Sequence, residues 1–306
     1  MPGKLNGTLV PIEPTLAAPP RGLRRHTHQM PIAAPSPSPA ELLDLATRTA
    51  ENAAHLLVDG LRRGGLTVDT KSSATDMVTE IDRAAESLIA GMIIGERPDD
   101  GLVGEEGTNR PTSSGVRWVV DPIDGTTNYL YGHPGFAVSI AAEILDGDPS
   151  GEAVTVAGVV WVPLLDEVYT ATIEGGAHRN GASIHASVVT DPATALVASG
   201  FSYDPDRRRR QAEVLTQVLP QVRDLRRMGA ASVDLCSVAC GRVDAFYERG
   251  LQPWDHAAGA LIAREAGATV ATLDGGPPST ACILAANPGL WPRLSTMLSD
   301  AGAADA

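Results

Sequence analysis

The sequence predicts a mixed fold, an α+β half followed by an α/β half, and the changing pattern of its apolar residues carries this prediction. Helical spacing prevails at first, within residues 38–99, and short runs rich in Val, Ile and Thr follow. From about residue 187 onward, strand-like and helix-like segments alternate. We therefore expect a first half over residues 39–186 and a second half over residues 187–306.

The first half should begin with two amphipathic helices. Ser38 is a suitable N-cap for the first helix, which Gly64 and Gly65 bring to an end. The second helix is expected within residues 79–99. A short apolar run at 117–122 precedes three segments that indicate an antiparallel meander, because they are rich in Val, Thr and Ile and have turn residues between them; these are 136–145, 154–163 and 166–181.

The second half alternates between helices and strands. A helix running towards a strand is expected over residues 231–248. The other strands are expected at 195–201, 268–274 and 281–287, and the other helices at 207–222, 256–267 and 289–302. Residues 1–38 are rich in Pro, Ala and Arg and lack an apolar period, so they are expected to form a disordered tail.

The composition is that of a globular protein and disfavours a nucleic-acid-binding or membrane-spanning one. The 306-residue chain is 43% hydrophobic, enough for a sizeable core, and has a net charge of −13. An acidic surface argues against a nucleic-acid partner, and the lack of an apolar run of about 18 residues argues against a membrane span. The three cysteines are too few for a disulfide framework, which indicates a reducing, cytoplasmic setting. Cys236 and Cys240 should pack as small apolar side chains rather than bind a metal.

Two acidic stretches stand close together in the sequence, GLVGEEG at 101–107 and DPIDGTTNYL at 121–130. Four carboxylates in them would repel one another unless a cation lies between them, and hard oxygen ligands suit Mg²⁺. A helix that begins at the Gly-Thr-Thr turn would direct free N–H groups at a phosphate in the same space. Taken singly, each stretch could instead be a solvated surface turn. Their joint occurrence favours a site where the acids hold metal and the turn holds phosphate.

Four motifs in this order resemble those of the inositol monophosphatases. They are KSSATDMVTEID at 71–82, GEEG at 104–107, DPIDGTTN at 121–128 and PWDHAAGALIAREAGA at 253–268. The resemblance spans roughly residues 40–300. It implies a layered α/β/α/β/α sandwich of the inositol monophosphatase type, a Mg²⁺-dependent phosphomonoesterase activity with inositol 1-phosphate as the substrate, and a homodimer.

The resemblance also implies a set of metal ligands. The first site would use Glu105, Asp121 and the backbone carbonyl of Ile123, and the second would use Asp121, Asp124 and Asp255. A third, weaker metal would share Glu105. For Asp255, a purely structural role is also open, because it stands at the N-cap position of the helix expected at 256–267.

Further residues receive catalytic roles from the resemblance. The backbone N–H groups of Gly125 and Thr126 should bind the phosphate. The Thr126 hydroxyl, with Asp82 behind it, should orient or deprotonate the attacking water, and Glu106 should lie beside that water. Lys71 should balance the negative charge of the ligands and the phosphate.

The substrate ring would contact the second half of the chain. The resemblance implies that the backbone from Gly229 to Ala231 and the carboxylate of Glu248 bind ring hydroxyls, for which a carboxylate is a good acceptor. Without the resemblance, we would expect Glu248 to form a surface salt bridge with Arg249 or Arg242.

Two other readings remain open from the sequence. Related phosphatases act on histidinol phosphate, fructose 1,6-bisphosphate or 3′-phosphoadenosine phosphate, and they share the metal motifs. Thr127-Asn128 and the FYE sequence at 246–248 favour inositol phosphate. A non-catalytic regulatory scaffold of the same fold is the alternative of another class, and the presence of every implied ligand counts against it.

Overall fold

A computed structural model describes residues 3, 37–63, 68–70, 77–145 and 153–306, with no side-chain description for residues 63, 68–70 and 77–79. Lys71 and nearly all of the expected tail therefore lie outside the described residues. The described strands form one sheet of eight, one of five and one of two. No helix among the described residues is both long enough and apolar enough to cross a membrane.

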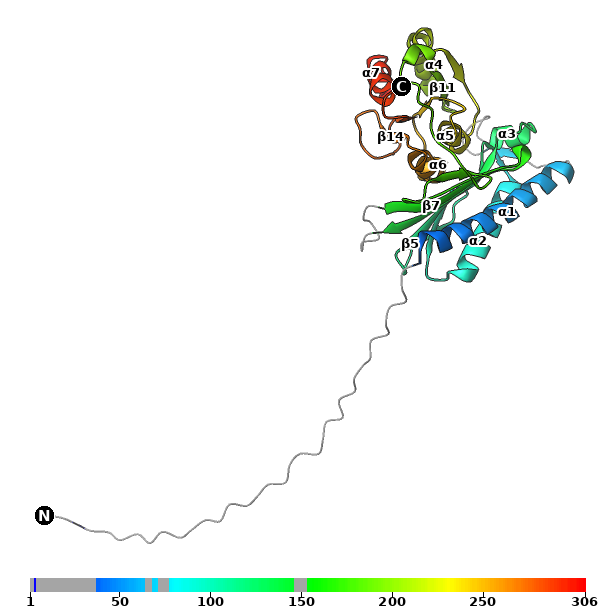
Figure 1. Ribbon diagram of the computed structural model, residues 1–306. Coiled ribbons are helices and arrows are strands. Elements are labelled where there is room, and N and C mark those ends of the chain that lie inside the picture. Colours follow the sequence, from blue (N-terminus) through cyan, green and yellow to red (C-terminus); the bar gives the residue numbers. More distant parts are fainter. Residues whose placement is uncertain (1–2, 4–36, 64–67, 71–76, 146–152) are drawn as a thin grey trace. The chain divides into compact units, whose positions relative to one another are not determined.

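The eight-stranded sheet carries two helices on its outer face, α1 (Pro39–Arg63) and α2 (Glu80–Glu96) (Figure 1). Its strand order is β10-β9-β8-β7-β6-β5-β3-β4. The strands are β3 (Gly101–Gly104), β4 (Asn109–Arg110), β5 (Val116–Asp124), β6 (Ala137–Leu145), β7 (Ala153–Val162), β8 (Glu167–Thr172), β9 (Ala177–Arg179) and β10 (Ala182–Ser183). All neighbours are antiparallel except β3 and β5, which are parallel. The short α3 (Thr126–Leu130) follows β5, and β1 (Val68–Thr70) pairs with β2 (Met77–Thr79).

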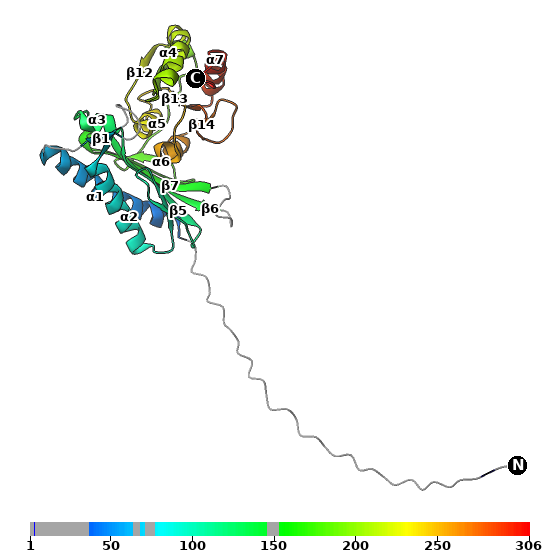
Figure 2. The ribbon, with the colours of Figure 1, turned by 180° about the vertical axis from the view of Figure 1, so that it is seen from behind.

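The five-stranded sheet has the order β12-β11-β13-β15-β14. Its strands are β11 (Leu196–Ser199), β12 (Asp224–Arg226), β13 (Ala245–Glu248), β14 (Thr269–Thr272) and β15 (Ile283–Ala286). Helices α5 (Ala231–Ala239) and α6 (Pro253–Glu265) lie between this sheet and the first, and α4 (Pro205–Val218) and α7 (Trp291–Asp300) cover its other face. The view from behind shows the same order of layers (Figure 2).

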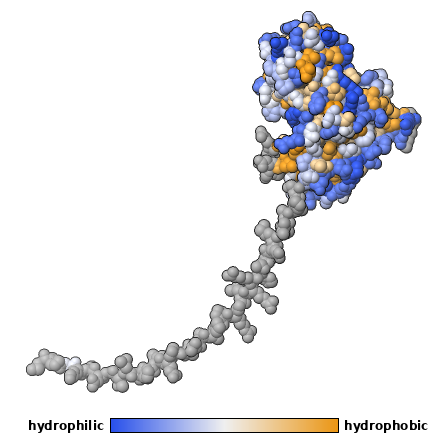
Figure 3. Space-filling view, viewed as in Figure 1, coloured by the Kyte–Doolittle hydropathy of each residue, from blue (hydrophilic) through white to orange (hydrophobic). Residues whose placement is uncertain are grey.

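Alternating side chains along the strands fill three separate cores. In β5, Trp118 and Val120 face α1 and α2, whereas Val119 faces the helices between the sheets. In β13, Phe246 faces the middle layer and Tyr247 faces α4 and α7. The expected α/β/α/β/α sandwich is confirmed by this arrangement. On the face seen in Figure 3, hydrophilic residues surround several separate apolar patches.

Small residues make the middle layer thin. A Cβ atom on Gly158 of β7 would lie 3.1 Å from the Cα of Ala258 in α6. A Cβ on Gly259, also in α6, would lie 2.9 Å from the Cβ of Leu235 in α5. Helix α6 therefore contacts both the first sheet and α5 at close range.

Most expected helices and strands are present, and the cap at Ser38 is confirmed: Ser38 Oγ accepts from Glu41 N (3.3 Å), and Glu41 Oε2 accepts from Ser38 N (2.8 Å). The sequence did not predict β3, β4, β12 or the β1–β2 pair. The strand β3 matters most, because it leads directly into Glu105. The first sheet is built from residues 101–183 and the second from 196–286. A domain boundary near residue 187 stays a prediction.

Candidate active site

Parallel pairing of β3 with β5 brings the two acidic stretches together. Gly104 stands opposite Val120, and Glu105 N donates a hydrogen bond to Val120 O at 3.3 Å. The residue after each partner is acidic, so Glu105 lies beside Asp121. This pairing explains why two stretches separated in the sequence hold their carboxylates at one point.

A buried carboxylate supports the turn that carries Glu105 and Glu106. Glu86, on α2, accepts hydrogen bonds from Glu106 N at 2.7 Å and from Thr108 N at 2.9 Å. A side chain at Gly104 would overlap the Glu86 carboxylate, so the small residue is required here. The Glu106 side chain is only 4% exposed, and its Oε2 lies 3.9 Å from Arg83 Nε. Glu86 therefore fixes the backbone of the turn through two hydrogen bonds from α2.

At the end of β5 the chain turns into α3. Asp121 Oδ1 accepts from Ile123 N at 3.0 Å, and the pairing with β6 shifts register between Asp121 and Asp124. Gly125 then adopts φ 87°, a left-handed conformation that favours glycine. A Cβ on Gly125 would lie 3.1 Å from Ala230 Cβ and 3.2 Å from two carbonyl oxygens. The expected helix start at the Gly-Thr-Thr turn is confirmed.

Thr126 links this turn to α2. Its Oγ1 lies 3.4 Å from Asp82 Oδ2 and 3.2 Å from Ile123 O, and Asp82 is 1% exposed. Thr126 therefore contacts both of the other groups that we expect to position water and metal, Asp82 and the Ile123 carbonyl.

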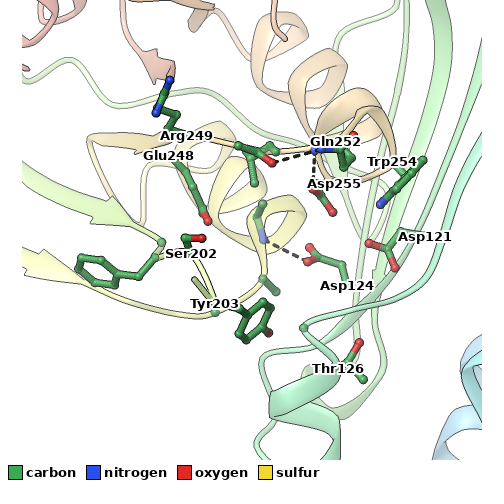
Figure 4. Close-up of a pocket in the computed structure, with 18 of the residues that line it drawn as sticks. Asp121, Asp124, Thr126, Ser202, Tyr203, Glu248, Arg249, Gln252, Trp254 and Asp255 are labelled. Atoms are coloured by element: carbon green, nitrogen blue, oxygen red, sulfur yellow. Dashed lines mark hydrogen bonds between the residues drawn. The ribbon is translucent and has the colours of Figure 1, made fainter. Parts of the chain in front are cut away.

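Asp124 is held by the start of α5. Its two oxygens accept hydrogen bonds from Ala231 N at 3.2 Å, Ser232 N at 2.7 Å and Ser232 Oγ at 2.5 Å. Figure 4 shows one of these bonds as a dashed line to Asp124. Free N–H groups at a helix N-terminus favour a carboxylate. The Ala231 N–H, expected at the substrate ring, is thus directed to Asp124.

Asp255 enters the site from α6. It is the third residue of this helix and not its N-cap, which is Gln252, so the N-cap placement was wrong. Asp255 Oδ2 accepts from Gln252 N at 2.6 Å, as in a capping box. Asp255 therefore does cap the N-terminus of α6, but it does so as the third residue of the helix.

Burial and mutual repulsion weaken the acidity of these carboxyl groups. Burial, and then the charges of Glu105, Asp124, Asp255 and Asp82, raise the pKa of Asp121. Burial also raises the pKa of Asp124 and, with the Asp124 charge, that of Asp255. A cation among them would relieve these costs.

The donor set suits a hard cation, although the side chains are not yet arranged as ligands. Within the described ranges, no group of three His, Cys, Asp or Glu side chains stands in a geometry that would hold a metal ion. One oxygen of each of Asp121, Asp124 and Asp255 accepts a hydrogen bond from a backbone N–H group. A donor set made only of oxygens is the kind that Mg²⁺ prefers. These ligand assignments stay predictions.

Glu248, at the end of β13, is half-buried and points into the site (Figure 4). The expected alternative, a surface salt bridge, is absent among the described residues: Arg242 pairs with Glu167, and Arg249 Nη1 donates to Ala306 O at 2.8 Å. A side chain at Gly200 would overlap the Glu248 carboxylate. Burial, and then the Asp124 charge, raise the pKa of Glu248 to about 8.

One cavity of about 550 Å³ brings most of the predicted residues together. It is lined by Glu105, Asp121, Ile123, Asp124, Gly125, Thr126, Gly229, Ala231, Glu248 and Asp255. Asp82 and Glu106 are not among the residues that line the cavity, and Lys71 is outside the described residues. The sequence did not point to Ser232, which holds Asp124, or to Tyr203, Arg207 and Arg227, which line the cavity.

Comparisons with known proteins agree with this geometry. A model of the inositol monophosphatase family matches residues 38–301. The chain is 42% identical over 254 residues to the inositol-1-monophosphatase SuhB of Mycobacterium tuberculosis, covering 77% of this chain and 85% of that protein. It is 36% identical over 251 residues to the Nus factor SuhB of Escherichia coli, covering 81% of this chain and 91% of that protein.

A solved structure is also similar. The extragenic suppressor protein SuhB of Bartonella henselae matches with a TM-score of 0.78 at 35% identity, covering 84% of this chain and 98% of that chain. The family model spans residues 38–301, and these relatives and the solved structure each cover more than three quarters of the chain. The protein therefore belongs to the inositol monophosphatase family.

Proposed function

We propose that the protein is a Mg²⁺-dependent phosphomonoesterase that hydrolyses inositol 1-phosphate to inositol and phosphate. The single observation that carries this proposal is the cavity in which Glu105, Asp121, Asp124 and Asp255 meet the turn at Gly125. Members of the family are generally metal-dependent, and relatives are named inositol-1-monophosphatase. A cytoplasmic homodimer is part of the proposal on the family resemblance alone.

The carboxylates and the Ile123 carbonyl would hold the cations. Bound Mg²⁺ would neutralise the phosphate, lower the pKa of a coordinated water and stabilise the leaving oxygen. Ile123 O lies beside the Thr126 hydroxyl at 3.2 Å, so the metal-binding and water-positioning groups are neighbours.

The protein's own groups would orient the reactants. The N–H groups of Gly125 and Thr126 would bind phosphate oxygens, because these residues stand at the start of α3 and line the cavity. Thr126 Oγ1, in contact with Asp82, would hold the attacking water and accept or relay its proton. Glu106 would lie beside this water.

Phosphate release tests the proposal directly. The purified protein with Mg²⁺ should hydrolyse inositol 1-phosphate with a higher kcat/KM than histidinol phosphate, fructose 1,6-bisphosphate or 3′-phosphoadenosine phosphate. If one of the other three compounds is the best substrate, the protein is still a phosphomonoesterase, but its substrate is not inositol 1-phosphate. No hydrolysis of any of the four would contradict the catalytic proposal.

A regulatory role is the second candidate, because a relative is named a Nus factor. A chain with that role alone would not need its metal ligands. Here the cavity retains Glu105, Asp121, Asp124 and Asp255, and Thr126 still contacts Asp82. These retained groups favour catalysis, either alone or beside a partner-binding role.

Glu248→Gln should separate substrate recognition from chemistry. Glu248 points into the cavity from β13, and a hydrogen bond to a charged group contributes roughly 1.5–3 kcal/mol. Cations bound nearby would favour its ionised form over the neutral one. We expect kcat/KM for inositol 1-phosphate to fall about ten- to hundredfold, with hydrolysis of p-nitrophenyl phosphate, which has no ring hydroxyls, spared.

The control for Glu248 is Glu167→Gln, which removes a carboxylate that pairs with Arg242 away from the cavity. This variant should leave the ratio of kcat/KM for the two substrates unchanged. If Glu248→Gln also leaves that ratio unchanged, Glu248 has no part in recognising the ring.

A further inference from the structure

Helix α2 carries two buried carboxylates, and each of them contacts a different acidic stretch of the site. Asp82 and Glu86 are four residues apart on the buried face of the helix and are 1% and 3% exposed. Asp82 Oδ2 lies 3.4 Å from Thr126 Oγ1, in the stretch at 121–130. Glu86 accepts hydrogen bonds from the turn that ends the stretch at 101–107. One face of α2 therefore supports both stretches.

The Glu86 carboxylate binds the backbone of this turn with one hydrogen bond for each oxygen. Its Oε2 accepts from Glu106 N at 2.7 Å, and its Oε1 accepts from Thr108 N at 2.9 Å. Within the described ranges, these two N–H groups are its hydrogen-bond partners, and no arginine or lysine pairs with it. A buried carboxylate is costly unless its oxygens are satisfied, so the carboxylate and the turn stabilise each other.

Both peptide groups that flank Glu105 are fixed. The N–H of Glu105 itself donates to Val120 O in β5 at 3.3 Å, and the N–H of the next peptide, that of Glu106, donates to Glu86. Peptide groups are planar, so two fixed planes determine the backbone dihedrals of the residue between them. Glu86 and Val120 together therefore set the direction in which the Glu105 side chain leaves the backbone.

The turn also encloses the carboxylate that supports it. Gly104 N donates to Thr108 O at 2.8 Å and closes the turn. Gly104 is the last residue of β3, and a Cβ on it would overlap the Glu86 carboxylate. A displacement of this carboxylate would therefore disturb the residue directly before Glu105.

We propose that Glu86 is a positioning residue for the metal site, which acts through Glu105 and raises the affinity for Mg²⁺ without touching the ion. The inference rests on the proposed function, in which Glu105 is a metal ligand. Partners behind metal ligands orient them, and their loss typically lowers metal affinity about 10- to 100-fold. Since Asp82 stands on the same face of α2, one helix would hold the groups that bind the ions and the Thr126 hydroxyl in register.

Two variants of Glu86 separate the position of its oxygens from its charge. Glu86→Gln keeps the length of the side chain, but its amide has one acceptor oxygen, so one backbone N–H would face an NH₂ group. Glu86→Asp keeps the charge, but it is one methylene shorter and would not reach the turn. Calorimetry on the metal-stripped protein without substrate should show that both variants bind Mg²⁺ about 10- to 100-fold more weakly than wild type.

Kinetics provide a second readout of the same effect. The Mg²⁺ concentration that gives half-maximal hydrolysis should rise in both variants by a factor similar to the loss of affinity. Most of kcat should return at saturating Mg²⁺, because Glu105 itself is retained. A residue that only stabilised the fold would lower the midpoint of thermal unfolding and leave the Mg²⁺ requirement unchanged.

Glu265→Gln is the matched control. Glu265, at the end of α6, accepts hydrogen bonds from Glu174 N at 3.0 Å and Gly176 N at 2.9 Å, so it holds the turn between β8 and β9 in the same way. The variant removes the same charge and breaks the same kind of contact at a turn that does not line the cavity. It should lower the midpoint of thermal unfolding and keep the affinity for Mg²⁺.

Wild-type Mg²⁺ affinity in Glu86→Gln would overturn the positioning role. Wild-type affinity in Glu86→Asp would also overturn it, since the charge alone would then explain any loss in Glu86→Gln. The Asp variant decides the question if the Gln variant does not fold. An equal loss of affinity in Glu265→Gln would attribute the effect to general destabilisation and would overturn the proposal too.

The positioning role and the proposed function fail in different ways. Weaker Mg²⁺ binding in both Glu86 variants, with no hydrolysis by wild type, would keep the positioning role and contradict the phosphatase. Hydrolysis by all variants with an unchanged Mg²⁺ requirement would do the opposite. A wild type that hydrolyses no substrate and binds no Mg²⁺ would contradict both.

Discussion

Replacing Asp124 by Asn is expected to lower kcat by about a hundredfold or more at saturating Mg²⁺. The change removes a charge from the group that we propose as a metal ligand and leaves the shape of the side chain nearly the same. The fold should survive, because the change removes a buried charge that repels Asp121 and Asp255, while Asn can still accept one of the bonds from α5. Steady-state kinetics and a thermal unfolding curve measure both effects.

Ser232→Ala provides the control for Asp124. It removes the hydroxyl that donates to Asp124 Oδ2 at 2.5 Å and leaves the carboxylate in place. We expect a fall in kcat of less than about tenfold, in line with the loss of one hydrogen bond. An equal fall in both variants would mean that the contact with α5, rather than the carboxylate charge, controls the rate. An unchanged kcat in Asp124→Asn would refute the ligand assignment.

Removal of metal should abolish hydrolysis of phosphate monoesters, and Mg²⁺ should restore it. Without a cation, the raised pKa values of Asp121, Asp124 and Asp255 mean that the folded protein keeps protons that the unfolded chain releases. The stability of the metal-free protein should therefore fall as the pH rises from about 4 through these raised values. Mg²⁺ should reverse this loss by displacing the protons.

The measurement is a pair of titrations after treatment with EDTA and desalting. Phosphate release reports activity, and the midpoint of thermal unfolding reports binding, which should rise with Mg²⁺ and rise more at higher pH. Full activity in a thoroughly stripped sample would refute the mechanism. Restored activity with no shift in unfolding would mean that the ions bind elsewhere or only with substrate.

The sequence predicted those helices and strands whose own apolar pattern matches the secondary structure that they form. Helices α1 and α2 have clear apolar periodicity, and β6 to β8 are rich in β-branched residues with turns between them. Strand β3 was not predicted, because Gly101 and Gly104 are weak strand formers. Its extended form comes from parallel pairing with β5, which is a tertiary contact that a local pattern does not record.

The same distinction, between local pattern and tertiary contact, separates the site residues that the sequence predicted from those that it did not. Asp121, Asp124 and Asp255 stand in motifs, so the sequence alone pointed to them, and the cavity brings them together. Arg207 stands in no motif that we recognised. Arg227 and Ser232 stand in the segment RRMGAASVDL at 226–235, which resembles the family's substrate-binding segment, but the resemblance pointed only to the Gly229–Ala231 backbone there. The places of these three residues depend on how α4, α5 and the turns before them meet β5 in three dimensions, which local spacing does not encode.

The thin middle layer also bears on how the family can change. Gly158 and Gly259 carry no functional group, yet any side chain on them would push α6 away from β7 or from α5. Asp255 stands four residues before Gly259 on the same rigid helix, so that displacement would move a carboxylate of the site. The positions that tolerate least change in this protein therefore include two residues that take no part in the chemistry.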